Sequence, residues 1–194
     1  MSYLIRESSN SPLVKDSKHS NILEGVFTVF NVQNRNGRIY TFEEFEPHYN
    51  EILEKVNQGC CLGTLDHPED MEVKLSTASH VIEKLEYDSK KQQINGRIRL
   101  LTTEMGKTAQ ALVNDGINLS ISSRAIGDVD MNNVVHIERL ICWDIVSDPG
   151  FAQAKLNVVN ESFGGGKSNA IFIPINTGIM TFDEYCRNKK RRRF

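Results

Sequence analysis

The chain has 194 residues, a formal net charge of -2 and 39% hydrophobic residues, a balance typical of a soluble globular protein with one core. No apolar run approaches the roughly 18 residues of a membrane span, so we do not expect a membrane protein, and no basic start followed by an apolar stretch suggests secretion. Four irregularly placed cysteines, Cys60, Cys61, Cys142 and Cys186, favour reduced thiols in a cytosol-like compartment.

The N-terminal part predicts an arm, a strand and a helix. Residues 1–21 are polar and aperiodic, so we expect a flexible arm there. Residues 22–32 (ILEGVFTVFNV) are rich in β-branched and aromatic side chains, which predicts a strand, and the Asn-Gly pair at 36–37 predicts the turn after it. Thr41 can cap a helix that Gly59 ends.

The rest of the expected domain mixes strands with one more helix. We expect a loop at residues 60–74, strands at 78–88 and 92–101, a helix at 102–116, and strands at 118–129 and 134–147. Strands gathered around two helices, without strict alternation, favour an α+β fold. We therefore expect a mostly antiparallel sheet or a small β-barrel, with helices packed outside it.

Three regions are expected along the chain. Residues 22–161 form the main domain after the arm at 1–21. Residues 162–194 combine a glycine-rich linker (SFGGGKS) with a basic C-terminal appendage, which ends in RNKKRRRF. A block of cations like this is typical of a solvated tail, and contact with nucleic acid or an acidic protein stays open.

Three residue types suited to nucleophilic catalysis occur in the expected strands and loops. Serine is a poor nucleophile until a base takes its proton and a third group orients that base. Ser122 lies on an expected strand, and His67 precedes Pro68 in an extended loop. Asp144 is an acid in an apolar strand, so it needs an arginine or a histidine as partner. Spacing alone leaves open whether the three meet.

The residues after the serine can support the same chemistry. Ser123 and Arg124 offer backbone N–H groups and a guanidinium to an oxyanion. Three alternatives stay open: Ser120 as nucleophile, His80 as a second catalytic histidine and His136 as the third member. No metal site and no cofactor are expected, because the spacing of cysteines and histidines matches no usual ligand pair.

Four motifs in order carry a family resemblance. They are NRNGRIY at residues 34–40, GTLDHPE at 63–69, ISSRAIG at 121–127 and WDIVSDPGFAQA at 143–154. Together they resemble the tailed-phage prohead proteases of the T-even type, a family similar in fold to the herpesvirus maturational proteases. The resemblance implies His67 as base, Ser122 as nucleophile and Asp144 as third member, a place that a second histidine takes in the herpesvirus relatives.

Two positions depart from the family pattern. Thr64 stands where the pattern has glutamate, and we expect this change to be neutral for the chemistry. Ala125 stands where the pattern has glycine, so its methyl group is expected to narrow the oxyanion site. Ser120 follows a leucine, as the nucleophile does in a related family with an LSVGF-like motif, which keeps it as a rival to Ser122.

The resemblance implies a serine endopeptidase of the Ser-His-Asp type. Its expected substrates are scaffold or core proteins and major capsid protein precursors, cleaved in the host cytoplasm inside the assembling prohead, with self-cleavage. The alternative is a non-catalytic prohead core or scaffold assembly protein that keeps the protease fold. No membrane contact is implied, and homo-oligomerisation stays open.

Overall fold

The computed structural model describes residues 3–9, 21–148, 150–151 and 153–158. All of them belong to the compact unit Met1–Glu161. The expected linker and basic appendage, with Cys186, fall in the unit Ser162–Phe194 and lie outside the described residues.

The elements expected between residues 22 and 147 are present, with shifted ends. The strands are β1 Tyr3–Ser9, β2 Ile22–Val29, β3 Leu62–Thr64, β4 Ala78–Asp88, β5 Gln93–Leu100, β6 Ser120–Val129, β7 Val135–Val146 and β8 Leu156–Val158. The helices are α1 Phe42–Asn57, α2 Glu104–Asn114 and the short 3-10 helix η1 Leu75–Thr77. Three strands, β1, β3 and β8, add to the expected set.

Both longer helices begin at threonine caps. The Thr41 hydroxyl accepts a hydrogen bond from the backbone N–H of Glu44 at 3.4 Å, and Thr103 accepts one from Gly106 at 3.2 Å. Pro47 lies inside α1 without ending it. The helix therefore stays continuous where an irregular turn is expected, because it is held by packing of its buried face.

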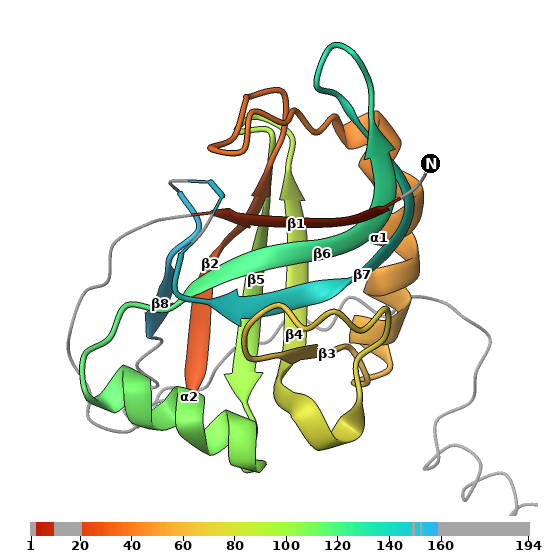
Figure 1. Ribbon diagram of the computed structural model, residues 1–194. Coiled ribbons are helices and arrows are strands. Elements are labelled where there is room, and N and C mark those ends of the chain that lie inside the picture. The colour runs from red at the N-terminus through yellow and green to blue at the C-terminus, as the bar shows by residue number, and fades with distance from the viewer. Residues whose placement is uncertain (1–2, 10–20, 149, 152, 159–194) are drawn as a thin grey trace, which may run out of the picture. The chain divides into compact units, whose positions relative to one another are not determined.

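The strands form two mostly antiparallel sheets. One has the order β1-β6-β7 and the other the order β3-β4-β5-β2-β8. Figure 1 shows β1, β6 and β7 crossing steeply in front of β2, β5 and β4, with α1 beside β7 and α2 at the ends of the other sheet's strands. Side chains from both sheets share one buried apolar cluster, which includes Phe27 and Ile98 from one sheet and Ile121 and Leu140 from the other.

The α+β class with mostly antiparallel sheets is confirmed, but the residues that the structure describes form two sheets and no closed barrel. Along their edges the two sheets are joined by isolated bridges, Leu65 with Ile145 and Ser120 with Lys155, and by a few backbone hydrogen bonds such as that from the Ile121 N–H to the Ala154 carbonyl. β3 and β8 have three residues each, which is too short to carry a full ladder onto β7 and β6. The barrel is therefore left open along these two seams.

The expectation of a flexible arm over residues 1–21 is wrong for β1. Residues 3–9 pair antiparallel with β6, with Ser8 opposite Ser122. The polar sequence of β1 carries no clear period because its order comes from the edge of β6, which offers a row of backbone donors and acceptors. Residues 10–20 of the expected arm lie outside the described residues.

Candidate active site

Two neighbouring strands bring Ser122 and Asp144 face to face. Ser122 of β6 is the direct register partner of Asp144 of β7, and both residues are fully buried. Side chains of an antiparallel pair that lie opposite each other point to the same face of the sheet. Ser122 and Asp144 therefore share the face away from Ile121, which packs in the core.

The loop that carries His67 is tied to the acid strand. Leu65 forms a parallel bridge with Ile145, and the backbone N–H of Asp66 donates to the Ile145 carbonyl at 2.8 Å. Asp66 has a φ of 62°, a conformation that aspartate tolerates better than most residues. This turn places His67 over the sheet next to Asp144.

The imidazole of His67 bridges the serine and the acid. Its Nδ1 lies 2.9 Å from Asp144 Oδ2, and its Nε2 lies 2.5 Å from Ser122 Oγ. Since Asp144 is a carboxylate, Nδ1 carries the proton and donates, which leaves Nε2 to accept the serine proton. The distance between Nε2 and Oγ is short enough for direct proton transfer from the serine to the ring.

Asp144 is a buried anion surrounded by donors. Burial alone would raise its pKa, but the hydrogen bond from His67 and the charge and hydrogen bonds of Arg124 lower the pKa well below the usual value. Arg124 donates through Nε to Oδ2 at 2.8 Å and through Nη2 to Oδ1 at 3.2 Å. Asp144 therefore stays ionised and can orient the imidazole.

The Arg124 guanidinium does not lie where an oxyanion donor is expected. Its guanidinium is fully buried behind Asp144, where it also donates to the carbonyl of Asp70 and contacts the Cys142 sulfur at 3.2 Å. Because side chains alternate along β6, Arg124 lies on the same face as Ser122. There its guanidinium pairs with the neighbouring Asp144 carboxylate. The contacts assign the guanidinium to the acid and to the loop after His67.

Cys142 completes the surroundings of the carboxylate. Its thiol donates to Asp144 Oδ1 at 3.1 Å. Burial and the nearby Asp144 charge raise the pKa of Cys142 well above its usual value, so the sulfur remains a neutral thiol. Cys142 is thus a hydrogen-bond donor to Asp144. The only sign of this contact in the sequence is that the two residues share a face of their strand.

The three alternative site residues lie outside the contacts that join His67, Ser122 and Asp144. Ser120 is opposite Val146 in the ladder, whereas the His67 ring contacts Ser122. His136 lies near Glu44, with its Nδ1 3.4 Å from the carboxylate, and 45% of its side chain is exposed. His80 is fully buried, and its ring contacts Ser79 and the carbonyl of Trp143.

His80 is expected to make folding sensitive to mild acid. Burial lowers its pKa from 6.5 to about 4, against the opposing charge of Asp144. Because the unfolded chain binds the proton first as pH falls, stability is lost between pH 6.5 and about 4, by about 3 kcal/mol. Urea unfolding from pH 7 to 4 measures this loss. His80→Gln should flatten the curve, and an equally steep curve would contradict the assignment.

Gly63 lets β3 approach β7 closely. A Cβ at this position would overlap the carbonyl oxygen of Trp143 and the ring of His80. Gly63→Ala is therefore expected to lower the free energy of unfolding by about 1–3 kcal/mol, as overpacking does. Urea unfolding at pH 7 measures the change, and a variant as stable as the wild type would show that the strands separate without cost.

Ser123 and Ala125 follow the serine on the strand. Both are buried, and Ala125 belongs to the hydrophobic core cluster. The Ala125 methyl group thus packs against apolar neighbours, which differs from the expected narrowing of an oxyanion site. The side chain of Ser123 is buried as well, and its backbone lies in the stretch of β6 that is paired with both β1 and β7.

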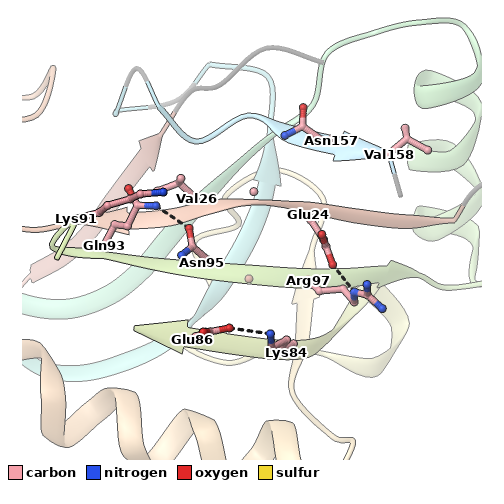
Figure 2. Close-up of a pocket in the computed structure, with 12 residues that line it drawn as sticks. Glu24, Val26, Lys84, Glu86, Lys91, Gln93, Asn95, Arg97, Asn157 and Val158 are labelled. Atoms are coloured by element: carbon pink, nitrogen blue, oxygen red, sulfur yellow. Dashed lines mark hydrogen bonds and ion pairs between the residues drawn. The ribbon is translucent and has the colours of Figure 1, made fainter. Parts of the chain in front are cut away.

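A hollow of about 620 Å³ lies on the five-stranded sheet, away from these residues. Figure 2 shows two pairs of oppositely charged side chains in it, Glu24 with Arg97 and Glu86 with Lys84. Paired, exposed charges of this kind contribute little to stability or chemistry. None of the lining residues belongs to the serine, histidine and aspartate cluster, so the hollow is a separate surface feature.

No group of three metal-ligating side chains is found in the described part of the chain. Over the same residues, no helix has the length and apolarity to span a membrane. The three free thiols that fall in the described ranges are Cys60, Cys61 and Cys142.

A nucleophile, a base and an orienting acid in hydrogen-bond contact can carry out acyl transfer, which is the chemistry of the serine hydrolase class. The chain belongs to the family of the prohead core protein serine protease, whose model matches residues 6–161. The family expected from the four motifs is thereby confirmed.

A solved structure shares the fold. The bacteriophage T4 capsid assembly protease, gp21, matches with a TM-score of 0.67 and 24% sequence identity, over 76% of this chain and 99% of that chain. Among curated proteins, none matches this chain.

Proposed function

We propose that the chain is a serine endopeptidase of the Ser-His-Asp type, with Ser122 as nucleophile, His67 as base and Asp144 as orienting acid. The observation that carries this proposal is the double contact of the His67 ring, 2.5 Å to Ser122 Oγ and 2.9 Å to Asp144 Oδ2. Membership in a serine protease family supports the same reaction class.

The proposed reaction moves one proton through His67. Nε2 takes the Ser122 proton as Oγ attacks the scissile carbonyl carbon, and the imidazolium then protonates the leaving amine. The carbonyl oxygen becomes an oxyanion, which needs hydrogen-bond donors. The backbone N–H groups of Ser123 and Arg124 lie in the stretch of β6 that is paired with both β1 and β7, so we expect these donors to come from other groups around Ser122. Water, deprotonated by the same ring, hydrolyses the acyl-enzyme and restores the serine.

The proposed substrates follow from the family. They are prohead core or scaffold proteins and major capsid protein precursors, cleaved inside the assembling prohead in the host cytoplasm. We further propose that the two-sheet fold is related to that of the herpesvirus maturational proteases. The class of substrate is thus a protein chain that meets the enzyme at high local concentration inside a closed shell.

Self-cleavage is part of the proposal. Residues 3–9 already lie extended beside the nucleophile strand, and Ser8 is the register partner of Ser122. Extended strands are the backbone conformation that a peptide adopts when it adds to a sheet edge. A segment of the chain itself is therefore extended beside the strand that carries the reactive serine.

The experiment is incubation of the purified full-length chain with a prohead core protein. Discrete fragments, identified by mass spectrometry and absent with Ser122→Ala, are the expected result. Ser120→Ala is the matched control, because it removes a buried hydroxyl from the same face of the same strand. An intact substrate would instead favour the non-catalytic assembly protein, and fragments lost only with Ser120→Ala would move the nucleophile.

A further inference from the structure

Thr64, at the end of β3, directs two donors at the acid. Its hydroxyl Oγ1 lies 2.7 Å from Asp144 Oδ1, and its backbone nitrogen lies 3.1 Å from the same oxygen. The residue is only 1% exposed, so water does not replace these contacts. We propose that Thr64 is a positioning residue, whose hydroxyl holds the Asp144 carboxylate in the rotation that presents Oδ2 to His67.

The single proton of the Thr64 hydroxyl has two candidate acceptors. Asp144 Oδ1 lies at 2.7 Å and the carbonyl oxygen of Asp66 at 3.2 Å. A charged acceptor at the shorter distance makes the stronger hydrogen bond. The hydroxyl therefore donates to Asp144, and the Asp66 carbonyl is the weaker neighbour.

The donors around the carboxylate divide between its two oxygens. Arg124 donates to both oxygens, so it holds the charge in place and shares in fixing the plane of the carboxylate. Thr64 and the Cys142 thiol contact Oδ1 alone, and His67 contacts Oδ2. A carboxylate that rotated would have to break the Thr64 contacts, and these therefore keep Oδ2 aligned with Nδ1 of His67.

The hydroxyl is not what holds β3 and the His67 loop in place. The Thr64 backbone N–H reaches Asp144 whatever side chain is present, and the loop is tied to β7 through the Asp66 N–H and the bridge of Leu65 with Ile145. Loss of the hydroxyl is thus expected to loosen the acid while the strand stays paired. A positioning role and a structural role then give different results.

The test rests on the proposed function and compares three variants of the full chain. Thr64→Val removes the hydroxyl at nearly constant volume, and Thr64→Ser restores it. Thr28→Val is the matched control, because the buried Thr28 hydroxyl bonds the Trp143 indole at 3.1 Å, one residue from Asp144 but off the carboxylate. The measurements are kcat and KM on a core-protein peptide, the rate at which diisopropyl fluorophosphate phosphorylates Ser122 with loss of fluoride, and urea unfolding.

Thr64→Val is expected to lower kcat and the rate of Ser122 phosphorylation by the reagent by about 10-fold, with KM within about 2-fold of wild type. Thr64→Ser should recover most of the loss, and Thr28→Val should lower stability without this change in kcat. Where Thr64→Val does not fold, Thr64→Ala serves in the same comparison. A wild-type kcat in Thr64→Val, or an equal loss of kcat in Thr28→Val, would overturn the role of Thr64 and leave the proposed function standing. Absence of any Ser122-dependent reaction in the wild type would instead overturn the proposed function, and the inference with it.

Discussion

Ser122→Ala is expected to lower kcat/KM for peptide cleavage by at least about 10⁴-fold, because it removes the atom that forms the acyl bond. His67→Ala should cause a similar loss, since the ring contacts Ser122 Oγ and is the base within reach of it. Groups that act on one proton behave as a unit. The double variant is therefore expected to be no slower than either single variant.

The measurement is cleavage of a core-protein peptide by each single variant and by the double variant. His136→Ala is the control for His67→Ala, since it removes an exposed histidine from the same strand that carries Asp144. Losses that multiply in the double variant would show that Ser122 and His67 act independently. A large loss with His136→Ala would point to a different third member.

Arg124→Met is expected to lower the free energy of unfolding by about 3–5 kcal/mol at pH 7, because it leaves the Asp144 carboxylate buried without its cation. Both side chains are fully buried and lie 2.8 Å apart between Nε and Oδ2. Urea unfolding measures the loss. Replacing both partners, as in Arg124→Met with Asp144→Asn, should recover part of it, since the uncompensated charge is then gone.

The pH dependence has a defined sign. The pKa of Asp144 is lowered in the folded wild type, so the stability that this carboxylate contributes is present above its ordinary pKa of 3.8 and is lost as pH falls below it. The deficit of Arg124→Met should therefore shrink in that range. Arg99→Met, which breaks the partly exposed pair with Glu83, is the control and should cost at most about 1 kcal/mol. Equal losses in both variants would contradict the assignment.

The orientation of several site residues follows from strand alternation. Ser122 and Arg124 are two residues apart, as are Cys142 and Asp144, so each pair shares a face of its strand. A buried acid in an apolar strand also needs a cationic or hydrogen-bonding partner, and Asp144 has both an arginine and a histidine. The signal for Arg124 was thus present, but its place after the serine favoured the oxyanion role.

The register that joins these strands could not be predicted. β6 and β7 shift past each other at irregularities between Arg124 and Ala125 and between Ile126 and Gly127. One such shift moves every following side chain relative to its partner. The pairing of Ser122 with Asp144 therefore depends on where the bulges fall, which no local pattern reveals.

Thr64 shows a second limit of the sequence. Threonine in place of the family's glutamate is expected to be neutral for the chemistry, because the motif alone shows no neighbour of this side chain. β3 has only three residues and is ordered by pairing with β4, with an irregularity between Gly63 and Thr64. Its hydroxyl meets Asp144 through contacts that span 80 positions of the chain.

The buried arginine also changes the formal charge count of the site. At rest, Arg124 cancels Asp144, while Ser122 and His67 are neutral, so these four groups sum to zero. When the imidazolium and the oxyanion form together, they add one positive and one negative charge, and the sum is again zero. The proposed reaction thus separates charge without adding any to a buried region, where salt screens poorly. Ionic strength is then expected to act on the meeting of enzyme and protein substrate far more than on the bond-breaking step.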